Sequence, residues 1–264
     1  MRILLAGDTH GNAFHLGRVF DHAVGKGAER IVQLGDFGYG WATTADGDDL
    51  FVETASQYAA KSGIPLYYIE GNHENFDALE AVLADKTPEP DGTYRMADGV
   101  YYIPRGTLLW WDGVRILCCG GATSVDKKYR VNGVSWWRQE EILFADVDTC
   151  LGRGRADILL THDFPWESTV VDRHLDPYWG VEAQEKTLAS RKKISRILGN
   201  CAAALNVHGH LHVPYTQDVH VRGQRTRIIG TNCDATPMHE STLLLDLRGD
   251  WKSATLGQIL PTQE

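Results

Sequence analysis

RILLAGDTHGN, at residues 2–12, joins an apolar run to a group of polar side chains. Residues 3–6 are continuously apolar, which is typical of a buried strand. Gly7 follows, and a glycine lets the backbone turn sharply and pass close to a ligand. Asp8 and His10 then stand where the strand ends. The stretch therefore predicts a strand that presents metal-binding side chains at the edge of a sheet.

The same arrangement recurs four times further along the chain. Its members are Gly35-Asp36, Gly71-Asn72-His73-Glu74, Thr161-His162-Asp163 and Gly209-His210-Leu211-His212. Two carboxylates, an amide oxygen and several imidazoles suit two adjacent divalent metals. Oxygen ligands suit Mg and Mn and imidazole suits Zn, Fe, Cu and Ni, so a mixed set favours Mn, Fe, Zn or Ni.

Strands and helices alternate in the first half of the chain, which predicts a parallel α/β sheet. The hydrophobic patterns predict strands at residues 3–6, 30–34 and 65–69 and helices at residues 14–24, 50–60 and 76–83. In such sheets ligands bind outside the carboxyl ends of the strands, and the first three motifs fall there.

The second half of the chain predicts a second sheet. A loop at 85–92 precedes short strands at 94–96, 100–103, 108–111 and 114–119, which are expected to form a meander joining that sheet. Further elements are expected as helices at 136–144 and 185–198, strands at 158–161 and 204–207, and tail strands at 215–221, 226–229 and 242–246. The tail strands are expected to close the second sheet. We find no repeat, low-complexity segment or linker, so one domain is expected over residues 1–264.

The five motifs resemble, in order and spacing, those of the calcineurin-like metallophosphoesterases, a family of two-metal phosphate-ester hydrolases. The resemblance extends from Gly7 to His212. It implies an α/β fold, a four-layer α/β/β/α sandwich in which two mixed sheets are flanked by helices. Two divalent metal ions are expected at the strand ends, with Mn²⁺ favoured and Fe, Zn or Ni as alternatives.

The resemblance also implies a role for each motif residue. Asp36 is expected to bridge the two metals. The ligands that complete one metal site are expected to be Asp8, His10 and His212, and those that complete the other Asn72, His162 and His210. A water or hydroxide between the metals would be the nucleophile, because two metals lower its pKa and stabilise the charge of an in-line displacement.

His73 is the expected catalytic residue, because the family's matching histidine faces the substrate and is thought to protonate the leaving oxygen. The Ser/Thr protein phosphatases of the family orient that histidine with an Asp and bind phosphate with an Arg, both in their second motif. This chain has neither residue there and reads Gly35-Asp36-Phe37-Gly38-Tyr39-Gly40-Trp41. The departure disfavours the protein-phosphatase branch. Glu74 is adjacent to His73 but is expected to cap the helix that follows.

Candidate substrate contacts are Asn12, Tyr39, Lys127 and Arg130. The rings of Tyr39 and Trp41 would stack on a nucleobase, or the glycine-rich loop that carries them packs against its neighbours. Lys127, Lys128 or Arg130 would replace the missing phosphate-binding Arg, since cations near a phosphoryl group stabilise its charge, or they are solvated loop cations.

The remaining histidines are expected to lie outside the site. His208 is predicted to be a packing residue or a neighbour of the ligands. His239 is expected at the surface, and the rim of the pocket is the alternative. No role in metal or substrate binding is expected for His15, His22, His174 and His220.

Composition excludes several classes of protein. The 264 residues carry a net charge of −9, and an acidic protein lacks the basic stripe that tracks long nucleic acids. No apolar run approaches the length of a bilayer span, and no signal peptide precedes the first strand. Five cysteines, an odd number, do not suggest a secreted disulfide framework. A cytoplasmic protein without membrane partners is expected, and its oligomeric state is not predicted.

The predicted function is therefore a phosphodiesterase that acts on small nucleotide-like diesters, with cyclic nucleotides as the first choice. A phosphomonoesterase or protein phosphatase is the alternative. A DNA nuclease is disfavoured by the acidic balance, and a non-catalytic scaffold is disfavoured because every ligand position is filled.

Overall fold

Two six-stranded sheets form the body of the protein, which is described here by a computed structural model of residues 1–45, 47–170 and 180–256. The first sheet has the order β12-β1-β2-β3-β5-β4. Its strands are β1 Arg2–Ala6, β2 Arg30–Gln33, β3 Leu66–Tyr68, β4 Tyr94–Ala97, β5 Val100–Tyr102 and β12 Thr242–Asp246. Strands β1, β2, β3 and β5 run parallel, and β12 and β4 pair antiparallel at the two edges.

The second sheet has the order β10-β11-β9-β8-β7-β6. Its strands are β6 Thr107–Trp111, β7 Val114–Cys119, β8 Ile158–Thr161, β9 Leu205–His208, β10 Tyr215–Val221 and β11 Gln224–Gly230. The four inner strands are parallel, and β6 and β10 are antiparallel edges. Both sheets are therefore mixed, as the sequence predicts.

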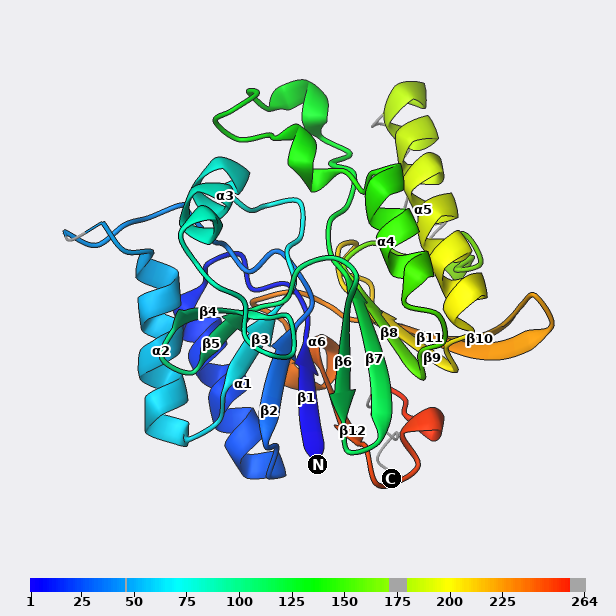
Figure 1. The fold of residues 1–264 in the computed structure, drawn as a ribbon, viewed down its shortest axis with the longest axis horizontal. Helices are drawn as coiled ribbons and strands as arrows, with labels where there is room; N and C mark the ends of the chain where they lie inside the picture. The colour runs from blue at the N-terminus through cyan, green and yellow to red at the C-terminus, as the bar shows by residue number, and fades with distance from the viewer. Residues whose placement is uncertain (46, 171–179, 257–264) are drawn as a thin grey trace, which may run out of the picture.

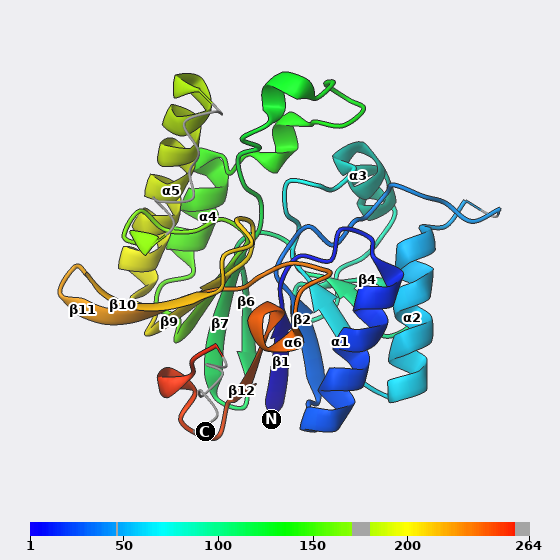
Figure 2. The same ribbon diagram turned by 180° about the vertical axis from the view of Figure 1, so that it is seen from behind.

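Helices cover the outer face of each sheet, which completes the four layers α/β/β/α (Figures 1 and 2). The helices are α1 Ala13–Lys26, α2 Leu50–Ser62, α3 Phe76–Ala84, α4 Phe144–Gly152, α5 Val181–Cys201 and α6 Met238–Ser241, with short 3-10 turns η1 Lys127–Tyr129, η2 Arg138–Glu140 and η5 Trp251–Ser253. Helices α1 and α2 lie on the first sheet, and α4 and α5 lie on the second.

Three apolar layers hold the sandwich together. The central cluster lies between the sheets and includes Leu5 and Val32 from one sheet and Leu160 and Val207 from the other. A second cluster joins the first sheet to α1 and α2, and a third joins the second sheet to α4 and α5. Strands buried on both faces read as continuous apolar runs, which explains the unbroken ILLA at residues 3–6.

Polar side chains fix where the helices of the first sheet begin. Asn12, Asp49 and Asn75 are the N-caps of α1, α2 and α3, and each accepts a hydrogen bond from a backbone N–H of the first turn. The caps of α1 and α3 directly follow the first and third motifs. The chain therefore turns from strand to helix just beyond the side chains that matter for function.

The second half departs from the predicted layout in three ways. The meander divides, because β4 and β5 extend the first sheet while β6 and β7 begin the second. The last tail strand, β12, pairs with β1 of the first sheet instead of closing the second. The predicted helix at 136–144 is wrong: this segment contains only η2, and α4 begins at Phe144. Trp136 and Trp137 are instead buried in the loop, so their apolar character reflects packing and not a helical face.

Among the described residues no helix is long and apolar enough to cross a membrane.

Candidate metal centre

The five motifs meet where the parallel strands of both sheets end. Asp8 follows β1, Asp36 follows β2 and Asn72 follows β3, all in the first sheet. His162 follows β8, and His210 and His212 follow β9, in the second sheet. The two sheets thus contribute opposite walls of one site, as expected for ligands at the carboxyl ends of strands.

One group of donor atoms comes from Asp8, His10 and His212. Their oxygen and nitrogen atoms all lie within 4.8 Å of one another. The Nε2 atom of His212 lies 3.0 Å from Oδ2 of Asp8. These are the residues that the sequence assigns to one metal together with Asp36, and His10 Nε2 lies 3.5 Å from Oδ2 of that carboxylate.

A second group adjoins the first and is fully buried. Donor atoms of Asp8, Asp36 and His162 again lie within 4.8 Å of one another. His162 Nε2 is 3.3 Å from Asp36 Oδ1 and 3.2 Å from the side-chain oxygen of Asn72. Asp36 thus reaches histidines of both groups, which is the position required of a bridging carboxylate.

His210 is the remaining predicted ligand. Its ring lies 5.1 Å from the ring of His162, centroid to centroid. Its Nε2 atom is buried and has no hydrogen-bond partner among the described residues. Buried polar atoms are nearly always paired, so an orphaned imidazole nitrogen beside two carboxylates fits a metal ligand.

The backbone is strained at the same residues. Among the described residues, eight other than glycine have positive φ, and His10, Asp36, His210 and His212 are four of them. Such conformations cost on the order of 1–3 kcal/mol each and persist where the surrounding structure imposes them. Half of these outliers therefore carry predicted ligand side chains.

Two motif glycines are required by close packing against the carboxylates. A Cβ atom on Gly71 would lie 2.1 Å from Oδ1 of Asp36, and one on Gly209 would lie 2.2 Å from Oδ1 of Asp8. No side chain fits in either position, which explains the glycine that precedes Asn72 and His210.

The charge of the site favours cations. Burial alone would lower the pKa of His10, His162 and His212, but the neighbouring carboxylates outweigh it and raise these values to about 9, 10 and 10. Burial alone would raise the pKa of Asp36, yet the charges of His162 and His73 hold it well below its usual range. A divalent cation bound by these residues would take the place of these protons, since metal-bound histidines are neutral.

The far nitrogens of the histidines are held by outer partners. His10 Nδ1 lies 2.9 Å from Oδ1 of Asp234, and His162 Nδ1 donates to the carbonyl of Leu34 at 2.7 Å. Cys233 lies close enough to His212 to contribute, after Asp8, to its raised pKa. Such partners fix the ring orientation and the tautomer of a ligand. Asp234 was missed by sequence reasoning, although an acidic residue four positions after the end of β11 was a usable signal.

His73 lies at the edge of this centre, and a guanidinium contacts it. Arg130 Nη2 donates to His73 Nε2 at 2.7 Å, so the ring proton of a neutral His73 sits on Nδ1. Arg130 is held by Asp126, whose Oδ1 lies 2.8 Å from its Nε, and its side chain is only 9% exposed. Burial lowers the pKa of His73, the charge of Asp36 opposes this, and Arg130 lowers it further.

The aromatic residues of the second motif take different positions. Tyr39 is buried in the cluster between the first sheet and its helices, so its ring offers no face to a ligand. Trp41 is half-exposed and its Nε1 donates to the carbonyl of His73 at 2.6 Å. The aromatic surface beside the site therefore belongs to Trp41.

Glu74 does not cap α3, as the sequence suggested, because Asn75 does so. Its buried carboxylate accepts hydrogen bonds of 2.8 Å from the backbone N–H groups of residues 37, 38 and 39. Glu74 therefore shapes the loop that follows Asp36. Burial raises its pKa to about 7.

The other candidate substrate contacts lie around the centre with partners of their own. Asn12 caps α1 and donates to Oδ2 of Asp234 at 2.8 Å. The ammonium of Lys127 lies over the ring of Trp136, 3.4 Å from its centroid, and 3.7 Å from Glu141. Neither side chain bonds directly to His73 in the described residues.

Histidines outside the motifs take no ligand position. His208 is buried and bonds to the hydroxyl of Tyr215 at 2.6 Å, as a packing residue does. His239 is at the surface, 3.8 Å from Glu240, and His15 is buried on α1. His174 lies outside the described residues.

The sequence matches a known protein family over most of its length. The family model described as calcineurin-like phosphoesterase matches residues 1–214. The chain belongs to this family. The five motifs of the phosphoesterase all lie inside the matched residues, and its donor groups are those of a metal-dependent enzyme.

Solved structures show the same fold at low sequence identity. The phosphoesterase resembles the protein TT1561 of Thermus thermophilus with a TM-score of 0.57 and 13% identity, over 97% of this chain and 98% of that one. A dimetal phosphatase from Danio rerio matches with a TM-score of 0.50 and 12% identity, over 92% and 91% of the two chains. No curated protein matches the sequence significantly.

Proposed function

We propose that this phosphoesterase hydrolyses small phosphodiesters, with cyclic nucleotides as the favoured class. The supporting observation is that, within the described parts of the chain, His73 contacts one guanidinium, that of Arg130, whose charge is already shared with Asp126. A diester phosphate carries one negative charge, whereas a monoester approaches two at neutral pH. The guanidinium of Arg130, partly neutralised by Asp126, together with two metal ions matches the single charge of a diester better than the two charges of a monoester.

The proposed metal ligands are the motif residues. Asp8, His10 and His212 hold one cation, Asn72, His162 and His210 hold the other, and Asp36 reaches both. Two divalent cations bound there supply a water of lowered pKa and neutralise charge on the phosphate. We favour Mn²⁺, because carboxylate and amide oxygens accompany the imidazoles.

His73 and Arg130 do the remaining chemistry in this proposal. His73 gives a proton to the leaving oxygen as a general acid, a step for which Nε2 carries the proton and Arg130 has moved off that atom. Arg130 moves from His73 to a phosphate oxygen of the bound substrate, since a guanidinium forms strong charge-assisted hydrogen bonds to phosphate. Arg130 therefore takes the place of the arginine that the second motif lacks.

Trp41 supports a nucleotide as the substrate. Its indole ring is held by the carbonyl of His73 and packs edge-on against Trp137, at 5.8 Å between ring centroids. A fixed and half-exposed ring beside the reacting phosphate offers a stacking face, and every nucleobase has a matching one.

The proposal extends to location and partners. All five cysteines are free, which supports a cytoplasmic protein. The partner is a small phosphate ester and not a long nucleic acid, because the net charge is −9.

A direct test compares Mn-dependent turnover of bis-p-nitrophenyl phosphate, p-nitrophenyl phosphate, and 2′,3′- and 3′,5′-cyclic AMP. The proposal expects kcat/KM for the diester to exceed that for the monoester by roughly tenfold or more, and at least one cyclic nucleotide to be cleaved. A clear preference for the monoester would replace the diesterase with a phosphomonoesterase.

A further inference from the structure

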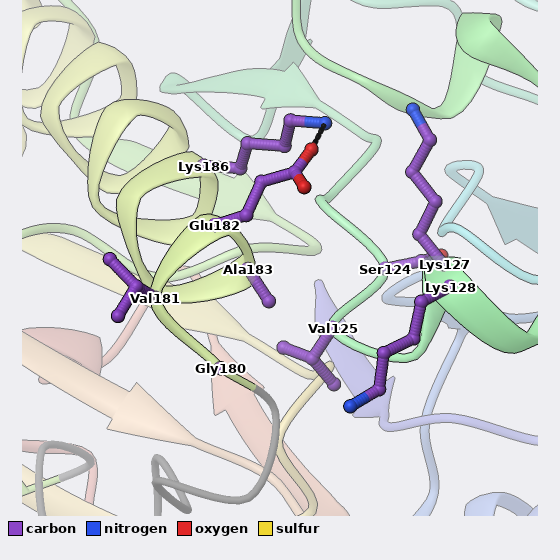
Figure 3. Close-up of a pocket in the computed structure, with 9 residues that line it drawn as sticks. All are labelled: Ser124, Val125, Lys127, Lys128, Gly180, Val181, Glu182, Ala183 and Lys186. Atoms are coloured by element: carbon purple, nitrogen blue, oxygen red, sulfur yellow. Dashed lines mark ion pairs between the residues drawn. The ribbon is translucent and has the colours of Figure 1, made fainter.

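A second concave site lies beside the metal centre, between the loop at residues 124–128 and the start of α5. The cavity measures about 420 Å³, within the range of small-molecule sites. Figure 3 shows the loop on one side and the first turns of α5 on the other. The residues that line it are Ser124, Val125, Lys127, Lys128, Gly180, Val181, Glu182, Ala183 and Lys186.

The charge of this cavity is opposite to that of the molecule. Three of its nine lining residues are lysines and one is a glutamate, in a chain of net charge −9. Glu182 pairs with Lys186 at 2.8 Å along the helix, and its side chain is 83% exposed. An incoming anion can therefore replace this carboxylate as the partner of Lys186. Lysines bind phosphate as point charges.

Part of the lining of the cavity is apolar. Val125 comes from the loop and Ala183 from the first turn of α5, and Val181, which is 71% exposed, lies at the outer edge (Figure 3). Such a lining suits an uncharged body, such as a nucleoside, with its anionic group at the lysine rim.

Ser124 connects the cavity with the metal centre. Its hydroxyl accepts a hydrogen bond of 3.1 Å from the side-chain amide of Asn72. The oxygen of the same Asn72 side chain lies 3.2 Å from His162. The Asn72 side chain therefore contacts both a predicted metal ligand, His162, and the cavity wall at Ser124. The cavity wall at Ser124 is thus in direct contact with Asn72, itself a predicted metal ligand.

We propose that the cavity binds a second phosphate group of the substrate, so that the substrate is a nucleotide with two phosphates. The scissile diester lies at the metal ligands, the nucleoside lies against Val125 and Ala183, and the second phosphate contacts Lys128 and Lys186. This assignment rests on the proposed function for the position of the scissile phosphate.

Calorimetry on the Mn-loaded protein tests the proposal with two product-like nucleotides that differ by one phosphate. Adenosine 3′,5′-bisphosphate is expected to bind roughly tenfold or more tightly than adenosine 3′-monophosphate. In the double variant Lys128→Gln, Lys186→Gln this preference is expected to fall to about twofold or less. The double variant Lys26→Gln, Lys61→Gln changes two exposed lysines at the ends of α1 and α2, and as the charge-matched control it is expected to keep the preference.

Equal affinities for the two nucleotides, or a preference that survives in the double variant, would overturn the second-phosphate site. Turnover of bis-p-nitrophenyl phosphate is measured in parallel. Its absence in the wild type, with the nucleotide preference intact, would reject the proposed diesterase and leave the phosphate site standing.

Discussion

Arg130 and Asp234 illustrate what single residues contribute beyond the motifs. Both lie far in sequence from the side chain they contact, His73 for Arg130 and His10 for Asp234. The ligand residues themselves were predictable, because each follows a glycine or an apolar strand in a fixed pattern. Arg130 was also named, as a candidate substrate contact. The contacts that Arg130 makes with His73 and Asp234 with His10 were not predicted, since a contact across 57 or 224 residues depends on the path of loops that have no periodic pattern.

Substitution of Arg130 tests the replacement of the missing arginine. Arg130→Gln is expected to lower kcat/KM for bis-p-nitrophenyl phosphate roughly 100-fold, because a preorganised donor to the transition state is lost. Metal content should not change, since Arg130 contacts none of the proposed ligands in the described residues. Arg155→Gln, at an exposed position before β8, is the control. Equal rates for both variants would remove Arg130 from the mechanism.

Substitution of Asp234 tests the support of His10. Asp234→Asn is expected to weaken Mn²⁺ binding by roughly 10–100-fold, because the partner that orients a histidine ligand is weakened. Equilibrium dialysis against Mn²⁺ measures the effect. Asp148→Asn, at an exposed carboxylate on α4, is expected to bind Mn²⁺ as the wild type does. If both variants bind equally well, Asp234 does not support the metal site.

At the level of elements, the prediction succeeded where the hydrophobic period is strong. The three parallel strands and three helices of the first sheet lie close to their expected bounds. The predicted helix at 136–144, between β7 and α4, was wrong, because the buried side chains of Trp136 and Trp137 gave the sequence an apolar pattern typical of a helix. The prediction also misplaced β12, because the partner of an edge strand is chosen by the packing of the whole sheet.

Glu140, in η2, makes this loop sensitive to pH. Burial raises its pKa to about 7, and its Oε2 has no hydrogen-bond partner among the described residues. Between about pH 4.5 and 7 the folded protein therefore holds a proton that the unfolded chain has lost. As pH rises through this window, ionised Glu140 destabilises the fold by an amount on the order of 2 kcal/mol.

Urea unfolding at pH 5 and pH 7 measures this effect. The loss of stability from pH 5 to pH 7 is expected to be smaller in Glu140→Gln than in the wild type. Glu185→Gln, at an exposed position on α5, should follow the wild type. An identical pH dependence in all three proteins would show that folding does not raise the pKa of Glu140.

For the whole molecule, the candidate metal ligands come from both sheets. Asp8, Asp36 and Asn72 come from the first sheet, and His162, His210 and His212 come from the second. The central apolar layer also holds the sheets together, but it ends below this edge of charged and polar side chains. Cations bound between the sheets are therefore expected to stabilise the fold as well as the reaction.

Thermal unfolding with and without Mn²⁺ measures this coupling. At 100 times the dissociation constant each site adds about 2.7 kcal/mol of stability. Two sites together add about 5.4 kcal/mol, so for a protein of this size the melting temperature should rise by roughly 10–20 °C when Mn²⁺ is added after chelation. Asp8→Asn is expected to lose most of this rise, whereas Asp148→Asn keeps it. A wild-type melting temperature that does not respond to Mn²⁺ would contradict the coupling.

The central claim is that Asp36 joins two metals into one catalytic centre. The measurement that tests it most directly is the number of Mn²⁺ ions bound per chain, with turnover of bis-p-nitrophenyl phosphate, in the wild type and in Asp36→Asn. We predict two ions and turnover in the wild type, and fewer than two ions with no turnover in Asp36→Asn. Two bound ions and wild-type turnover in Asp36→Asn would contradict the account.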